Sequence, residues 1–189
     1  MYSCKPIFRV FVLFAFVFLG AEMIAQTQIY YWHFNTLPSG NLGTITPDVS
    51  LLPANAGIFY DGTGAGYLDM VSPGTEINLQ AGTAIGIGLR TRNPSVTRSL
   101  VMALPTTGYT AVVVKFATAR TSAGAAVQNY SYSLDGGTTY STAGMTVTSY
   151  VPTVEPEYGL VTLDFSTISG ASNNPNFRVR IEFELPPKS

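Results

Sequence analysis

The chain has 189 residues, the size of one domain, with 10 Lys and Arg against 11 Asp and Glu and a formal net charge of −1. Its basic residues gather only at Arg90, Arg92 and Arg98, so nucleic acid is not an expected partner. A single cysteine, Cys4, excludes an internal disulfide and the thiolate zinc sites.

Residues 1–25 have the organisation of a secretory signal peptide. Lys5 and Arg9 precede an unbroken apolar run over 10–19, and small residues follow, so we expect cleavage after residue 25. The run is shorter than the ~20 residues that span a bilayer, which predicts no stable membrane insertion after cleavage. The remaining domain, 26–189, is expected to be secreted to the medium or the cell surface, or to the periplasm if it has no outer-membrane export signal.

Beyond the signal peptide the sequence shows no helical periodicity. Gly, Pro and Asn interrupt it at intervals of roughly 8 to 15 residues, which is typical of a sandwich or barrel of short strands. The pattern predicts strands at 29–35, 56–60, 66–71, 83–90, 98–104, 110–119, 128–134, 145–150, 158–165 and 176–185. We therefore predict an all-β fold, an antiparallel two-sheet β-sandwich of jelly-roll-like form, in a single domain.

Two of these strands carry large apolar side chains of particular interest. In the first, Trp32 and Phe34 share a face and are expected to join the core. The strand at 110–119 is apolar on both faces, a pattern that favours a central strand over an edge strand.

The last third of the chain has the clearest β pattern. The stretch 130–140 contains Asp135-Gly-Gly, which supplies the positive φ of a tight hairpin turn. Phe177, Val179, Ile181, Phe183 and Leu185 then alternate with charged residues, as in a strand with one buried face.

Few residues are suited to catalysis. His33 is the only histidine and has no nucleophile motif near it, so a catalytic triad is not expected. The carboxylates lie scattered along the sequence, and a glycosidase needs two of them across one cleft. We expect no enzyme activity and no cofactor other than a structural calcium ion, whose candidate ligands are Asp61, Asp69 and Asp164.

Tyrosines near the predicted strand ends are candidate ligand-binding residues. Aromatic rings stack on the apolar face of a sugar while tolerating water at their edges, and strand ends carry binding loops. Tyr67, Tyr109 and Tyr140 are the ones we select. The neighbouring pair Arg90 and Arg92 suits a carboxylate, and we expect its partner to be an acidic residue on an adjacent strand.

Several short motifs resemble a family of secreted bacterial β-sandwich modules that are exported through the type IX pathway. They are Tyr-Trp-His-Phe-Asn-Thr-Leu-Pro-Ser-Gly (31–40), Leu-Arg-Thr-Arg-Asn-Pro-Ser (89–95), Leu-Pro-Thr-Thr-Gly-Tyr (104–109), Tyr-Ser-Leu-Asp-Gly-Gly (132–137) and Asn-Asn-Pro-Asn-Phe-Arg-Val-Arg-Ile (173–181). The resemblance covers nearly all of 28–185 and implies a jelly-roll-like fold and a place on the cell surface. Such modules usually continue into a further strand, so the chain is expected to lack its last strand and to self-associate through an open sheet edge.

These observations lead to one functional hypothesis with two alternatives. We expect a non-catalytic extracellular module that mediates adhesion or contact with a polysaccharide or cell-surface glycan. The first alternative is a purely structural spacer domain of a surface protein. The second is a glycoside or polysaccharide hydrolase that uses a carboxylate pair.

Overall fold

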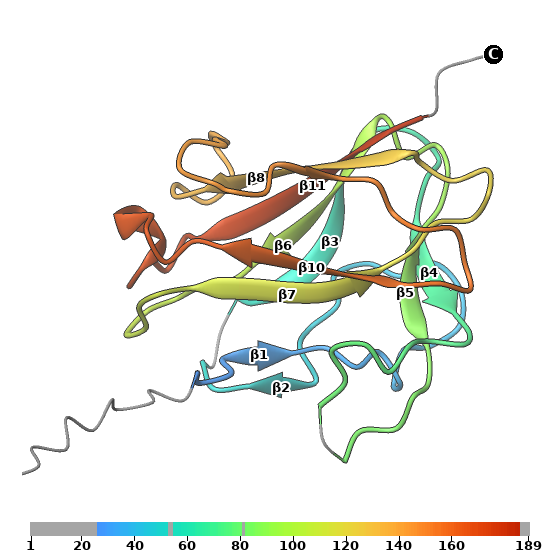
Figure 1. Ribbon diagram of the computed structural model, residues 1–189, viewed down its shortest axis with the longest axis horizontal. Helices are drawn as coiled ribbons and strands as arrows, with labels where there is room; N and C mark the ends of the chain where they lie inside the picture. Colours follow the sequence, from blue (N-terminus) through green and yellow to red (C-terminus); the bar gives the residue numbers. More distant parts are fainter. Residues whose placement is uncertain (1–25, 53–54, 81, 186–189) are drawn as a thin grey trace, which may run out of the picture.

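The computed structural model describes residues 26–52, 55–80 and 82–185, and it confirms an all-β, antiparallel β-sandwich. All strand pairs within its sheets run antiparallel (Figure 1). The strands are β1 (Tyr30–Tyr31), β2 (Val49–Ser50), β3 (Gly57–Gly62), β4 (Leu68–Val71), β5 (Gly88–Thr91), β6 (Arg98–Ala103), β7 (Val113–Thr118), β8 (Val127–Ser133), β9 (Ser149–Tyr150), β10 (Gly159–Asp164) and β11 (Arg178–Glu184). The predicted signal peptide lies outside the described residues.

One layer of the sandwich is a five-stranded sheet in the order β3-β6-β11-β8-β9. The last strand, β11, lies in its middle and pairs with β6 on one side and β8 on the other. The alternation predicted for β11 is confirmed, because Phe177, Val179, Ile181 and Phe183 are buried while the charged residues between them are not. Leu185, predicted on the same face, is 49% exposed.

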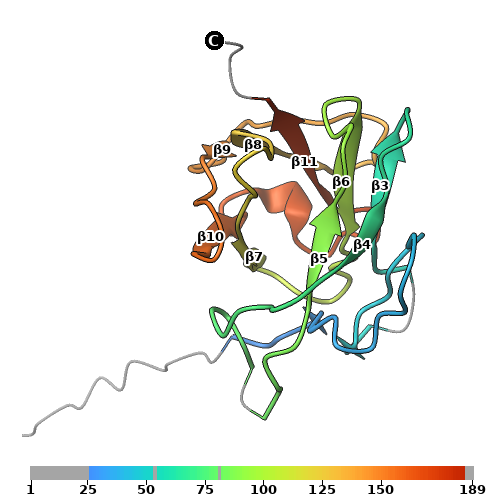
Figure 2. The same ribbon diagram turned by 90° about the vertical axis from the view of Figure 1, so that its right-hand side faces the viewer.

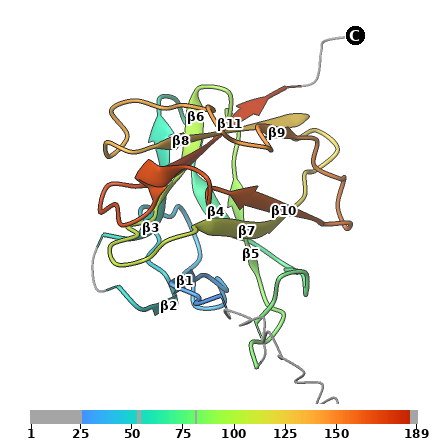
Figure 3. The same ribbon diagram turned by 60° about the vertical axis from the view of Figure 1, so that its left-hand side comes forward.

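The second layer consists of two separate ribbons that are not hydrogen-bonded to each other as one sheet. The ribbon β7–β10 lies across the five-stranded sheet, and the ribbon β4–β5 lies at the end of β7 (Figures 1 and 2). A third ribbon, β1–β2, lies on the side of β7 away from β10 (Figures 1 and 3). The second layer is therefore interrupted along β7.

The core lies between the layers and is rich in aromatic rings. Phe165 and Phe177 meet edge to face with centroids 5.1 Å apart, and Tyr132 packs against Phe165 in the same way at 5.8 Å. A single turn of 3-10 helix, Ser169–Ala171, places the fully buried Ala171 among them. The predicted role of Trp32 and Phe34 is confirmed in that both pack against this core, although both stay partly exposed.

The strand at 110–119 was predicted to be central, and this is wrong. It forms β7, the edge of a two-stranded sheet, with only β10 beside it in the part of the chain that the structure describes. Its inner face packs Val114 and Phe116 on the core. Its second edge borders a cleft rather than another strand. The prediction failed because the pattern of apolar residues indicates how apolar each face of a strand is, but not whether both of its edges are paired.

Local backbone geometry shortens other predicted strands. Phe34 has φ 62°, which ends the extended conformation that would continue β1 to residue 35. Residues 83–87 belong to the connection before β5, so the predicted strand 83–90 is confirmed only over 88–90. The positive φ predicted for the Asp135-Gly-Gly turn is confirmed at Gly136 and Gly137, 77° and 92°. The tight hairpin is not, because the chain returns to β8 only through a bridge between Tyr132 and Ser141 and through β9.

None of the described residues forms a helix that is long and apolar enough to cross a membrane.

Candidate functional site

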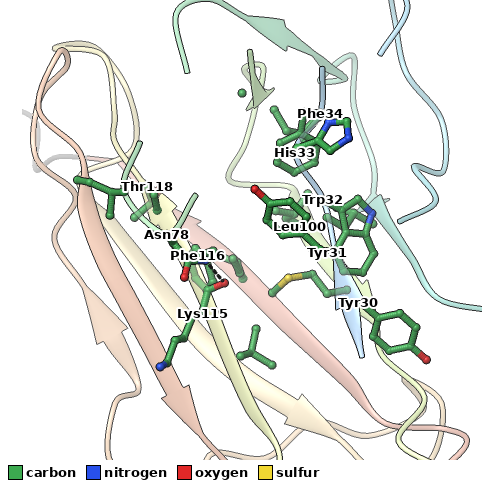
Figure 4. Close-up of a pocket in the computed structure, with 18 of the residues that line it drawn as sticks. Tyr30, Tyr31, Trp32, His33, Phe34, Asn78, Leu100, Lys115, Phe116 and Thr118 are labelled. Carbon is green, nitrogen blue, oxygen red and sulfur yellow. Dashed lines mark hydrogen bonds between the residues drawn. The ribbon is translucent and has the colours of Figure 1, made fainter. Parts of the chain in front are cut away.

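A long cleft of 1390 Å³ opens where the second layer is interrupted, between β7 and the N-terminal strand (Figure 4). It is larger than the ~300–1,000 Å³ typical of small-molecule pockets. The cleft follows β7, whose six residues extend for roughly 20 Å at about 3.3 Å per residue. These dimensions suit a segment of an extended polymer better than a compact metabolite.

The floor of the cleft is the inner face of the five-stranded sheet. Alternate residues of β6 and β11 point into it, namely Leu100, Met102, Ile181 and Phe183. Ile181 and Phe183 are buried, whereas Leu100 is partly exposed. The floor is therefore apolar and part of the folding core, and it gives the cleft a rigid base.

One wall is a row of aromatic side chains on the N-terminal strand. Tyr30, Tyr31 and Trp32 all line the cleft and are partly exposed (Figure 4). Hydrogen bonds fix their orientation: the Tyr30 hydroxyl donates to the Pro105 carbonyl at 2.8 Å, and the Trp32 indole N–H donates to the Ile45 carbonyl at 3.2 Å. Burial raises the pKa of the Tyr30 hydroxyl, so it remains a neutral donor.

The facing wall is the free edge of β7. Phe165 donates its N–H to the Val112 carbonyl, and the antiparallel register therefore directs the backbone groups of Val113, Lys115 and Ala117 away from β10. The Lys115 carbonyl accepts a hydrogen bond of 3.2 Å from the Asn78 side chain (Figure 4). The edge thus presents a row of backbone donors and acceptors to the cleft.

At the end of β7 the cleft is bordered by an ionic cluster on the β4–β5 ribbon. Arg90 donates to both oxygens of Asp69 at 2.9 Å, and the Arg92 Nε donates to one of them at 3.0 Å. The bonds from Arg90 are the main reason that the pKa of the Asp69 carboxyl is lowered, and the same pairing raises the pKa of Arg90. The prediction that this arginine pair meets an acidic residue on an adjacent strand is confirmed.

Of the three tyrosines selected from the sequence, two line the cleft and one does not. Tyr109 lies in the connection that precedes β7, and Tyr67 lies beside the ionic cluster at the far end of β7. Tyr140 lines a separate hollow of 570 Å³ on the outer face of the five-stranded sheet, together with Arg180. The Arg180 guanidinium covers its ring, and burial raises the pKa of its hydroxyl.

The candidate calcium ligands lie on different elements. Asp61 is near the end of β3, Asp69 is engaged by two arginines, and Asp164 accepts a hydrogen bond of 2.8 Å from the Ser166 N–H. Throughout the described residues no three Asp, Glu, His or Cys side chains gather in a way that would hold a metal ion. The described lining of the cleft also contains no pair of carboxylates, since Glu155 is the one acidic residue in it.

Sequence reasoning assigned Trp32 to the core and so missed its place in the wall of the cleft. The alternation of Tyr30, Trp32 and Phe34 indicates a shared face, and that face does contact the core. The pattern does not show that β7 lacks a second neighbouring strand among the described residues. Because no described strand fills that place, the outer part of the face that carries Trp32 stays open to the cleft.

Comparison of the chain with protein-family models, with curated proteins and with solved structures gave no match.

Proposed function

We propose that the protein is a non-catalytic module that binds a polysaccharide in the cleft along β7, outside the cell or at its surface. One observation carries the proposal: partly exposed aromatic rings and hydrogen-bonding groups line one open cleft for the length of a strand. Tyr109 and Tyr30 lie at one end, Trp32 on the wall, and Tyr67 at the other end.

This combination matches the chemistry of a sugar polymer. Each pyranose ring has an apolar face that stacks on an aromatic ring, and hydroxyl groups around its edge that need hydrogen-bond partners. The cleft offers both, since the free backbone groups of β7 lie opposite the aromatic wall.

The test is a binding titration of the purified protein against a panel of soluble polysaccharides, with affinity electrophoresis for the polymers of high mass. Tyr67→Ala and Tyr109→Ala are each expected to weaken binding about tenfold, by loss of ~1.4 kcal/mol of stacking. Tyr140→Ala is the matched control, because that tyrosine lies on the other face of the sheet, and it should bind as the parent does. Absence of binding to every polymer by protein with a cooperative melting transition would favour the structural-spacer alternative.

A second candidate function, adhesion through strand pairing, is favoured by the free edge of β7. An unpaired edge of six residues is a template for a strand from another copy or another protein. Ala117→Pro removes one N–H that points away from β10, and an edge strand accepts proline there. If copies pair at this edge, sedimentation should show association by the parent chain and a monomer for the variant; a parent chain that stays monomeric at high concentration would contradict this candidate.

A further inference from the structure

The charged residues of the protein are distributed unevenly about the cleft. The described residues include seven Lys and Arg and ten Asp and Glu. Only one of the ten acidic residues, Glu155, lines the cleft, yet four of the seven basic ones do: Arg90, Arg92, Lys115 and Arg120. In a protein with a net negative charge, the charged residues that line this cleft are therefore mainly cationic.

Three of the four cations are placed to act at one end of the cleft. Lys115 contributes its backbone, since its ammonium group points away from the aromatic wall (Figure 4). Arg120 donates to the main-chain carbonyls of Thr121, Ser122 and Pro152, which are uncharged, and its backbone is bonded to Glu155. This end of the cleft thus contains three arginines and two acidic residues, Asp69 and Glu155, so the formal charges leave an excess of one positive charge.

Asp69 orients the arginines rather than neutralising them both. It receives two hydrogen bonds from Arg90 and one from Arg92, so one negative charge holds two positive ones. The Arg92 side chain is 43% exposed and directs its Nε and Nη2 to the same Asp69 oxygen. A guanidinium has five N–H donors in a fixed plane, so the Arg92 group keeps donors for a second anion.

Tyr67 lies on the same face of the chain as Asp69, two residues away, and its carbonyl accepts a hydrogen bond from the Arg92 N–H. A partly exposed ring and an oriented guanidinium are therefore neighbours. A sugar that stacked on Tyr67 would place an acidic substituent within reach of Arg92, and a charged acceptor makes a stronger hydrogen bond than a hydroxyl does.

From this arrangement we infer that the ligand is an anionic polysaccharide, whose carboxylate or sulfate groups bind at Arg92 beside Tyr67. The inference rests on the proposed function, because it names the class of glycan that the same cleft takes. A neutral glycan gives Arg92 and Arg120 no charged partner. An acidic polymer supplies one at regular intervals, and it is attracted to the cationic end of the cleft before contact.

The experiment compares three kinds of polymer by titration calorimetry at low and moderate salt. Polygalacturonate and alginate carry carboxylates, carrageenan carries sulfate esters, and dextran and xyloglucan are neutral. We expect at least one acidic polymer to bind ten times or more as tightly as the neutral ones, with affinity falling as salt rises. Carboxylate-only or sulfate-only binding identifies which anionic group is recognised.

Arg92→Gln is expected to lower affinity for the acidic polymer about tenfold and to lower any affinity for a neutral polymer by a smaller factor. Arg178→Gln removes an equal charge from the outer face of the sheet and serves as the control, while Arg92→Lys retains the charge and should lose less affinity than Arg92→Gln. Thermal melts establish that each variant is folded.

Three outcomes would overturn the inference. Equal binding of neutral and acidic polymers would leave the proposed function standing and this inference wrong. Equal losses for Arg92→Gln and Arg178→Gln would indicate diffuse attraction rather than a site. Failure of the folded parent protein to bind any polymer would remove the proposed function itself.

Discussion

The guanidinium carbon of Arg180 lies 3.9 Å from the centroid of the Tyr140 ring, close to van der Waals contact. The same guanidinium donates to the Ser131 hydroxyl at 3.2 Å and forms an ion pair with Glu182 at 3.1 Å. Arg180 thus ties the loop after β8 to the outer face of β11. This is a stabilising role, and it occupies one face of the Tyr140 ring.

We expect Arg180→Ala to lower the free energy of unfolding by about 1–2 kcal/mol, because a partly buried cation–π contact and two polar contacts are lost together. Urea denaturation followed by tyrosine and tryptophan fluorescence measures this. Arg180→Lys should recover part of the loss, since it retains the charge without the planar group. Equal stability of the alanine variant and the parent would contradict the role assigned to Arg180.

Asp69 should make stability depend on pH. Its pKa is lower in the folded protein than the ordinary value of about 3.9 that applies to the unfolded chain. The stabilisation is therefore complete above about pH 4 and is lost as the pH falls through the lower, folded-state pKa. Asp69→Asn should cost about 1–2 kcal/mol at pH 7, where two arginines lose their shared anion, and less at pH 2–3.

Melting temperatures of the parent and Asp69→Asn, measured between pH 2 and pH 8, check this prediction. Asp164→Asn is a useful comparison, because Asp164 also has a lowered pKa but lies exposed at the end of β10 with no arginine partner among the described residues. A difference between Asp69→Asn and the parent that stays constant across the whole range would argue against the ion-pair explanation.

Phe177 lies at the centre of the core and is 1% exposed. Its ring packs edge to face on Phe165, and its carbonyl accepts the Leu104 N–H at 3.0 Å. Phe177→Ala should cost about 3–5 kcal/mol through loss of buried area and creation of a cavity. Phe177→Leu should cost less, and thermal melting of both variants ranks them; similar melting temperatures for the alanine variant and the parent would place the core elsewhere.

Gly66 lies where a side chain would collide with backbone. A Cβ atom at this position would meet the Pro94 carbonyl oxygen at 2.5 Å and that of Arg92 at 2.7 Å. Gly66→Ala should therefore cost about 1–3 kcal/mol by overpacking. Gly43→Ala is the matched control, because nothing lies within 4 Å of its Cβ, and urea midpoints should separate the two variants clearly.

The features that were predicted correctly depend mainly on residues close together in the sequence, whereas those that depend on contacts between distant residues were mostly missed. β11 was predictable because its alternation is local: each apolar residue along it is buried and each charged residue between them is not. The partner of Arg90 was predictable in kind, as an acid on a neighbouring strand, but the pairing of Asp69 with Arg90 depends on a register that only the folded ribbon defines.

The cleft could not be predicted for a related reason. Val114 and Phe116 give β7 the same apolar pattern whether its second edge is paired or open. The sequence likewise places three tyrosines near strand ends, Tyr67, Tyr109 and Tyr140. Which face of a sheet each tyrosine lies on depends on the folded position of the strands beside it, because successive residues of a strand point to opposite faces. Ile181 faces the cleft while Arg180, one residue away, faces the hollow at Tyr140.

The interruption of the second layer also bears on how the protein tolerates heat. The connection between β4 and β5 is joined to the β7–β10 part of the layer by single side-chain bonds, such as those from Asn78 to the Lys115 carbonyl and from the Tyr158 hydroxyl to the Pro73 carbonyl. A polymer bound in the cleft and in contact with both parts of the second layer would link them and so stabilise the layer. Resistance to thermal unfolding would then be a property of the protein and its surroundings together, rising wherever the polymer is plentiful.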